Sequence, residues 1–295
     1  MSQKAINAFK KLDNDDFEIL EAIERGIRAY EHVPIKIISL ISGFPEDEVV
    51  FRLDKLNKLE LILRWGGSYL GFELNSNGHD CLALNALVRA NVIEAIGMPI
   101  GVGKESDVYE ALTPEKETVV IKLHRLGRTS FRQTRRLRSY TAGRKHLSWL
   151  LESQIAARRE YVALKRIYPV ISSVPEPLGQ NRHCVVMELI EGEELSIILE
   201  IKEPNAILTE IIEIVKTIYR SCEIIHADLS PFNVLYNADD GSVTLIDFPQ
   251  WVNSKTHPNA DSLLKRDVKN ILIFFKKRFE ISEDIMKILH YLKES

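Results

Sequence analysis

Three oxygen-bearing side chains have the types and spacing that phosphoryl transfer needs. Asp228 and Asn233 are five residues apart in IIHADLSPFNVLY, and Asp247 follows 19 residues after Asp228 in LIDF. A carboxylate at Asp228 can accept or orient the proton of a nucleophile. The oxygens of Asn233 and Asp247 are hard ligands of the kind that Mg²⁺ prefers when it bridges phosphates. The spacing predicts a site that acts on a magnesium-bound phosphate compound.

A glycine-rich stretch and a lysine upstream supply groups that hold phosphates. Gly101 and Gly103 lie in IGVGKESDVYEAL between two expected strands, where the missing Cβ lets backbone N–H groups approach phosphate oxygens. An ordinary hairpin turn would explain these glycines equally well. However, Lys122 follows Gly103 by 19 residues in VVIK, on an expected strand with apolar neighbours. This order of elements matches the motifs of ATP-dependent kinases, with Ser106 in place of the third glycine of G-x-G-x-x-G.

Two further residues have an expected role beside these. Glu160, on an expected long helix, is the predicted ion-pair partner of Lys122, although several other glutamates compete for it. His226 precedes Asp228 by two residues, and we expect it to be a structural side chain bonded to the backbone rather than a catalyst.

The first 90 residues predict a compact module of helices with a hairpin. Apolar residues recur at helical spacing from residue 17, a short helix is expected at 34–41, and a third at 46–58. Two β-prone runs joined at Gly66-Gly67 predict a hairpin with a two-residue turn, and a fourth helix is expected at 79–90. This order is typical of a winged helix.

The expected groove-entering helix, EDEVVFRLDKLNK, is poorly equipped for DNA because it carries four acidic and three basic residues. The pattern favours docking to protein or RNA over sequence-specific DNA binding, and a purely structural module stays open.

From residue 91 the pattern changes to mixed strands and helices. It predicts three antiparallel strands within 91–125, a long helix at 148–167, a buried strand at 183–192, an amphipathic helix at 204–221 and a small hairpin closed at Asp240-Gly241. The last 35 residues are expected to be helical.

The charge is unevenly distributed along a chain whose net charge is -3. Residues 118–151 hold nine Lys or Arg and no Asp or Glu. A block of this kind is expected on a surface that meets phosphates of nucleotide or nucleic acid, and the alternative is a solvated loop.

Composition excludes several classes of protein. The 295 residues are 45% hydrophobic and 27% charged, which is ordinary for a folded protein of about two domains. The three cysteines form no C-x-x-C pair and predict a reducing, cytoplasmic compartment. We expect no secretion signal and no membrane segment.

The strings HADLSPFNVL, IDFPQW, GVGKESDVY, VVIKLHRLGRTSF and RDVKNILIFF together resemble the RIO family of atypical serine/threonine protein kinases. The winged helix resembles that of its type-two subfamily. The resemblance implies an α+β protein in which an N-terminal winged helix precedes a reduced bilobal protein-kinase-like RIO domain. The implied limits are 1–90 for the winged helix with a linker helix, 91–190 for the N-lobe with a basic flexible loop at 127–145, and 191–295 for the reduced C-lobe.

The resemblance also implies a role for each matching residue, with ATP and Mg²⁺, or Mn²⁺, as cofactors. Asp228 and Lys122 would be catalytic, and Asn233 and Asp247 would hold the metal. The residues that would bind the nucleotide are Gly101, Gly103, Lys104, Ser106, Lys122, Glu160, Met187, Glu188 and Ile190, the last three at the adenine.

The sequence departs from conventional protein kinases in ways that bear on the substrate. Ala227 replaces the Arg of H-R-D, Pro249 replaces the Gly of D-F-G, and no A-P-E follows. Only 48 residues follow Asp247, too few for an activation segment and a large peptide-binding subdomain.

Three hypotheses follow. The first, which the resemblance implies, is an ATPase switch in maturation of the small ribosomal subunit, bound to a pre-ribosomal particle of rRNA and proteins, with a transient phosphate on Asp247. The second is a serine/threonine kinase that phosphorylates a free protein or itself, for example at Ser130, Ser139 or Thr141. The third is a catalytically idle, nucleotide-dependent RNA-binding scaffold, which the intact site residues disfavour.

Overall fold

The computed structural model describes residues 3–126 and 142–294. The chain forms two compact units, one of residues 1–117 with 125–151 and one of residues 118–124 with 152–295. Most of the predicted basic loop, with Ser130, Ser139 and Thr141, lies outside the described residues. The predicted limits of the three domains stay a prediction.

The first unit begins with the winged helix that the sequence predicts. Its sheet is antiparallel, in the order β1-β3-β2. The α1 helix and the short β1 strand were not predicted, whereas α4 has the predicted bounds. The elements are α1 (Gln3–Phe9), α2 (Asn14–Gly26), β1 (Val33–Pro34), α3 (Ile35–Ser42), α4 (Glu46–Lys58), β2 (Ile62–Gly66), β3 (Leu70–Leu74) and α5 (Ser76–Arg89).

A partly buried charge cluster fixes α4 against the start of α2. Asp13 and Asp16 form a capping box, in which each carboxylate accepts the backbone N–H of the other residue. The Arg52 guanidinium of α4 donates to Asp13 at 2.8 Å and to Asp16 at 3.0 Å. Because Asp16 is fully buried, its charge needs this partner.

The hairpin of the winged helix is confirmed, but the predicted two-residue turn at Gly66-Gly67 is wrong. Gly66 is still in the ladder, paired with Leu70, so three residues form the loop. The Trp65 ring crosses over Gly67, where an added Cβ would lie 2.0 Å from the ring, and Gly67 N–H donates to the Tyr69 carbonyl. Gly67 is needed here because a side chain would collide with the Trp65 ring.

The first unit ends in a second hairpin, formed by β4 (Ala95–Val102) and β5 (Ser106–Leu112) in antiparallel register. It carries the predicted glycine-rich stretch at its closed end. Helix α7 (Ala142–Ile167) begins within the first unit and continues into the second. It starts six residues before the predicted position 148.

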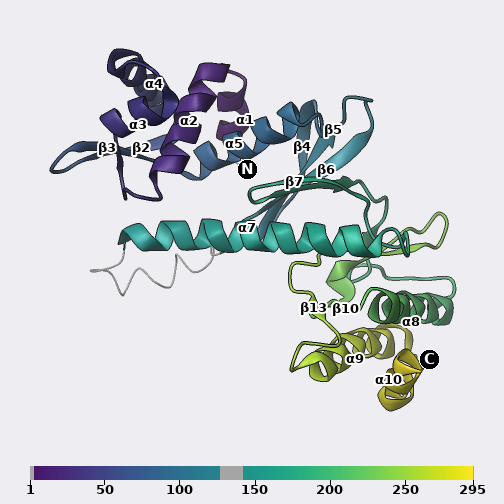
Figure 1. Cartoon of the computed structure of the whole chain (residues 1–295). Helices are drawn as coiled ribbons and strands as arrows, with labels where there is room; N and C mark the ends of the chain where they lie inside the picture. The colour runs from purple at the N-terminus through teal and green to yellow at the C-terminus, as the bar shows by residue number, and fades with distance from the viewer. Residues whose placement is uncertain (1–2, 127–141, 295) are drawn as a thin grey trace. The chain divides into compact units, whose positions relative to one another are not determined.

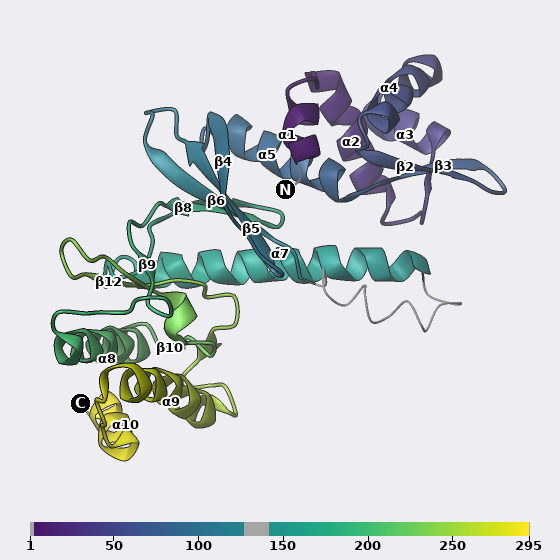
Figure 2. The same cartoon turned by 180° about the vertical axis from the view of Figure 1, so that it is seen from behind.

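The second unit contains the strand of Lys122 and the C-terminal helices. Strands β6, β8 and β7 pair antiparallel in that order, and β11 pairs with β12 and β9. Helices α8, α9 and α10 pack on one another, green to yellow in Figures 1 and 2. The elements are β6 (Thr118–His124), β7 (Pro177–Asn181), β8 (Cys184–Glu188), β9 (Glu193–Glu194), α8 (Pro204–Ser221), β10 (Ile224–Ile225), the 3-10 turn η2 (Pro231–Asn233), β11 (Val234–Tyr236), β12 (Val243–Leu245), β13 (Val252–Asn253), α9 (Ala260–Phe279) and α10 (Ile285–Lys293).

The predicted strands and helices of this unit are present, with several differences. Strands β7, β9, β10 and β13 were not predicted, and β8 ends at Glu188 rather than at Gly192. The C-terminal segment that was expected to be helical is divided at residues 280–284 into α9 and α10. Gly192 has φ of +138°, and an added Cβ there would lie 2.8 Å from the Tyr236 carbonyl oxygen. Its backbone therefore turns beside β11 instead of extending the strand. None of the described helices is long and apolar enough to cross a membrane.

Gly78 provides a test of packing in the winged helix. Replacing a helical glycine by alanine ordinarily stabilises by about 1 kcal/mol. Here an added Cβ would lie 2.3 Å from the Leu61 carbonyl oxygen, so we expect Gly78→Ala to lower the free energy of unfolding by about 1–3 kcal/mol in urea denaturation. Gly66→Ala is the control, because nothing lies within 4 Å of its added Cβ. Stabilisation by Gly78→Ala would contradict the packing described here.

Candidate functional site

The side chain of Lys122 joins two carboxylates in the second unit. Its Nζ donates to Glu160 Oε1 and to Asp247 Oδ1, each at 2.6 Å. The ion pair with Glu160 of α7 is the one that the sequence predicts, whereas the contact with Asp247 was not predicted. One ammonium thus connects β6, α7 and the segment after β12.

Burial and charge act in opposite directions on these groups. Burial alone would lower the pKa of Lys122, but the Asp247 and Glu160 carboxylates outweigh it and raise that pKa above its usual value. Burial would likewise raise the pKa of Glu160, yet the Lys122 charge and a hydrogen bond from His124 hold it well below its usual range. Lys122 and Glu160 both carry their charge at neutral pH, because each is held by an opposite charge in a poorly solvated place.

His124 completes the surroundings of Glu160. Its Nε2 lies 2.7 Å from Glu160 Oε2, and both side chains are buried. The two carboxylate oxygens of Glu160 therefore have separate partners, Lys122 on one and His124 on the other. This arrangement turns the carboxylate toward Lys122 and leaves it little rotational freedom.

Asp267 of α9 supports the loop that carries Asp228. Its carboxylate accepts the backbone N–H of Ala227 at 2.7 Å and that of Leu229 at 3.3 Å, so it holds the residues on both sides of Asp228. Ala227 has φ of +63°, a conformation in which non-glycine residues are strained. The two hydrogen bonds and the Arg266 contact with the Ala227 carbonyl keep the loop in this conformation.

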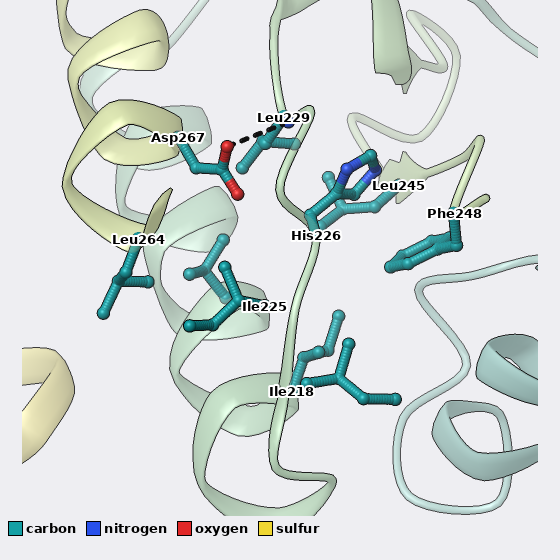
Figure 3. Close-up of a pocket in the computed structure, with 10 residues that line it drawn as sticks. Ile218, Ile225, His226, Leu229, Leu245, Phe248, Leu264 and Asp267 are labelled. Atoms are coloured by element: carbon teal, nitrogen blue, oxygen red, sulfur yellow. Dashed lines mark hydrogen bonds between the residues drawn. The ribbon is translucent and has the colours of Figure 1, made fainter. Parts of the chain in front are cut away.

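A small apolar pocket lies beneath this loop (Figure 3). Ile225, Leu229 and Leu264 line it, with Asp267 on one side and His226 on the other. Burial raises the pKa of Asp267 to about 7, against the lowering effect of its backbone donors and Arg266. His226 Nε2 is 3.0 Å from the Ile246 carbonyl oxygen, which confirms the expected contact with the backbone.

The predicted metal ligands lie at the same end of the antiparallel β11–β12 pair, Asn233 just before β11 and Asp247 two residues after β12. Ile246 N–H donates to the Asn233 carbonyl at 3.1 Å, which ties the Asn233 turn to the Asp247 segment. Asn233 Nδ2 donates to the Asp228 carbonyl at 2.9 Å, so its side chain presents Oδ1 as the remaining polar atom. Burial raises the pKa of Asp228, and the Asp247 charge adds to this effect.

These donors fit Mg²⁺. An amide oxygen and a carboxylate are hard ligands, and Mg²⁺ commonly takes one or two carboxylates and completes its shell with phosphate oxygens and water. No group of three or more His, Cys, Asp or Glu that could hold a metal is found among the described residues. Asn233 and Asp247 would thus hold the ion together with a phosphate ligand.

The segment after Asp247 is fixed to α7. Arg159 Nε donates to the Pro249 carbonyl at 2.8 Å, and its guanidinium also reaches the Trp251 carbonyl. Trp251 Nε1 donates back to the Arg159 carbonyl at 2.9 Å. Since Arg159 precedes Glu160, the same turn of α7 positions both the ion pair and the chain that follows Asp247.

The predicted phosphate-binding loop belongs to the first unit. Gly103 N–H donates to the Ser106 carbonyl at 2.8 Å, which closes a hairpin with Lys104 at its tip. Gly101 has nothing within 4 Å of an added Cβ, so its backbone has an open face. This geometry suits a close approach of phosphate, and these residues stay predicted ligands.

The three predicted adenine contacts differ in their surroundings. Met187 is buried in β8, Glu188 ends that strand and is exposed, and Ile190 is half-buried beyond it. The Glu188 N–H donates to the Glu176 carbonyl at 2.9 Å, so this amide already has a partner. Their role stays a prediction.

Sequence reasoning missed His124, Asp267 and Arg159, and two of them left a signal. His124 stands two residues after Lys122 and therefore faces the same side of its strand. Asp267 interrupts the apolar face of α9 at helical spacing, which indicates a carboxylate with a buried partner. Arg159 left no comparable signal.

Comparisons of the whole chain identify several similar proteins. The sequence profile named "RIO domain" matches residues 107–288, and that named "Rio2, N-terminal" matches residues 9–90. The serine/threonine-protein kinase rio2 of Dictyostelium discoideum is 39% identical over 92% of the chain, which spans 52% of that relative's length. The RIO-type serine/threonine-protein kinase Rio2 of Methanocaldococcus jannaschii is 39% identical over 90% of the chain and 99% of its own length.

A solved structure is also similar. The crystal structure of the Rio2 kinase-ADP/Mg²⁺-phosphoaspartate complex from Chaetomium thermophilum has a TM-score of 0.85 and 31% sequence identity, with coverage of 98% of this chain and 89% of that one.

The charge balance around Glu160 predicts how stability depends on pH. Its pKa is lower in the folded protein than in the unfolded chain, so its stabilising contribution is present above the unfolded value of 4.5 and is lost as pH falls below it. We expect Glu160→Gln to lower the free energy of unfolding most at pH 6–8 and progressively less toward ~pH 3. Urea denaturation of parent and variant across this range measures the difference. A difference that stays constant with pH would show that Glu160 is not an ionised partner of Lys122.

Proposed function

The chain belongs to the RIO domain family and within it to the Rio2 serine/threonine kinases, an atypical ATP-binding group, and we propose that it transfers the γ-phosphoryl group of ATP to its own Asp247. Hydrolysis of the resulting acyl phosphate would then reset the site. The observation that carries this proposal is that Asp247 reaches Lys122, the predicted phosphate-binding group, through a hydrogen bond of 2.6 Å. A carboxylate held next to a phosphate-binding ammonium can act as a covalent acceptor.

Each residue has a distinct part in the reaction. Lys122, oriented by Glu160, contacts phosphate oxygens as its motif implies. Asn233 and Asp247 hold Mg²⁺, which neutralises charge on the phosphates when it is bound. Asp228 orients a water molecule and accepts its proton, and burial, which raises the pKa of this carboxyl group, makes it a better proton acceptor.

The proposed steps balance as follows. A carboxylate oxygen of Asp247 attacks the γ-phosphorus, the bond from that phosphorus to the β–γ bridging oxygen breaks, and ADP leaves. Water then attacks the same phosphorus, the acyl oxygen–phosphorus bond breaks, and the Asp247 carboxylate is regenerated with inorganic phosphate. The proton of the water passes to Asp228. The Chaetomium relative, solved with ADP, Mg²⁺ and phosphoaspartate, supports such an intermediate in this family.

A single-turnover assay with γ-labelled ATP tests this proposal. We expect label on the protein that is sensitive to hydroxylamine, as an acyl phosphate is, followed by free labelled phosphate. Asp247→Ala should abolish both, whereas Asp228→Ala should still bind ATP but slow phosphate release by about 10²–10⁴-fold. Acid-stable label on serine or threonine would favour a conventional protein kinase, and no label and no phosphate would favour a nucleotide-dependent scaffold. Either result would contradict the proposal.

We further propose that this turnover acts as a switch in maturation of the small ribosomal subunit, in the cytoplasm. One feature of the sequence supports this role. Of the nine basic residues within 118–151, the seven other than the buried Lys122 and Arg125 form a block suited to rRNA phosphates. ATP turnover would then control the release of the protein from the particle.

Salt dependence tests the interaction with rRNA. Affinity for purified pre-ribosomal particles should fall steeply with salt, and alanine at Arg132, Arg135, Arg136 and Arg138 together should flatten the slope by about one unit for each phosphate that is no longer neutralised. ATP hydrolysis by the isolated quadruple variant should change much less. Unchanged affinity and slope would place the docking surface elsewhere, and sedimentation with labelled particles provides the measurement.

A further inference from the structure

On the basis of the ATP-binding function proposed above, we infer that Arg125, held by Asp80 and Asp107, is a positioning residue for the phosphate-binding loop. Through this contact the winged helix helps to set the affinity for ATP. All the residues concerned belong to the first unit. Arg125 stands three residues after Lys122 in the chain.

The guanidinium of Arg125 is clamped by two carboxylates from different elements. Its Nη1 and Nη2 donate to the two oxygens of Asp80 in α5, at 2.8 and 2.6 Å. Its Nε donates to Asp107 of β5 at 3.2 Å. The bidentate contact fixes the plane of the guanidinium, which a single hydrogen bond would not do.

All three side chains are buried. Arg125 is 5% exposed, Asp80 is 1% exposed and Asp107 is fully covered. Removing the guanidinium would leave two buried carboxylates without their cation, and this would lower the free energy of unfolding. The positions of α5 and β5 therefore depend on each other through Arg125.

The backbone of Arg125 extends this connection to the loop. Its N–H donates to the Glu105 carbonyl at 2.6 Å, at the tip of the hairpin that carries Gly101, Gly103 and Ser106. The side chain of Arg125 thus holds helix α5 while its backbone holds the loop. A shift of Asp80 would move Arg125 and with it the loop amides that are predicted to face phosphates.

The helices of the winged helix pack on one another, so a shift within it would also move α5. Helix α5 follows β3 directly and packs on α1 and α2. A ligand that changes the position of α5 would alter ATP affinity, and ATP would alter the affinity for that ligand by the same factor. This would give the winged helix, whose predicted groove-entering helix is poorly equipped for DNA, a role at the nucleotide site.

Three variants test the inference by steady-state kinetics and by ADP titration in the presence of Mg²⁺. Asp80→Asn keeps the shape of the side chain but removes its charge, and Arg125→Gln removes the guanidinium. Arg52→Gln is the matched control, because it removes a mostly buried arginine from the charge cluster of the same winged helix. Urea denaturation of all variants shows that each is folded under the assay conditions.

We expect Asp80→Asn and Arg125→Gln each to raise the KM for ATP by about tenfold, with kcat changed by less than about twofold, since loop contacts bind ground and transition states alike. The double variant should match the single ones, because both act through one contact. In the absence of nucleotide, hydrogen exchange at the backbone amides of Gly103 and of residue 125 should become faster in both single variants. Arg52→Gln should change neither KM nor this exchange.

Two results would overturn the inference. The first is a KM for ATP that changes no more in Asp80→Asn and Arg125→Gln than in Arg52→Gln. The second is a double variant whose effect equals the product of the single effects. If the parent itself does not bind ADP with Mg²⁺, the proposed function fails first, and this outcome is distinct because it appears without any variant.

Discussion

The site depends on one buried ammonium that lies between two carboxylates. Lys122 contacts Glu160 and Asp247 at equal distances of 2.6 Å, and His124 takes the second oxygen of Glu160. In a poorly solvated place these charges stabilise one another strongly, and removing one leaves its partners without compensation. In the proposed reaction, in which Asp247 holds the metal, its carboxylate would have to share or give up its contact with Lys122 when the metal and phosphates bind. The ion pair holds β6, α7 and the segment after β12 together. Its contact with Asp247 would have to loosen before that carboxylate could bind a metal.

The rest of the second unit keeps these groups in place. Asp267 holds the strained loop around Asp228 from α9, and Arg159 holds the chain after Asp247 from α7. Both act through backbone atoms, so the loop conformation does not rely on the side chains that face the substrate.

Much of this architecture follows from the sequence because it rests on local patterns. Helix α4 and helix α8 have their predicted bounds, since Pro and acidic residues mark the start of one and an amphipathic period marks the other. The Lys122–Glu160 pair was predicted from motif order. The Asp247 contact of Lys122, the turn at Gly67 and the role of Arg159 could not be predicted. The contact and the role of Arg159 join segments that are distant in sequence, and the turn depends on the packing of one ring. Long-range contacts and ring packing leave no periodic signal in the sequence.

Metal binding to the nucleotide-free protein tests most directly whether a divalent cation replaces Lys122 at Asp247. Mn²⁺, a spectroscopic substitute for Mg²⁺, can be titrated into parent and Lys122→Met protein while free Mn²⁺ is followed by electron paramagnetic resonance. If Lys122 competes with the metal for Asp247, the variant binds Mn²⁺ more tightly than the parent, and Lys122→Met combined with Asp247→Ala does not show this increase. Equal affinity of parent and Lys122→Met would contradict the account.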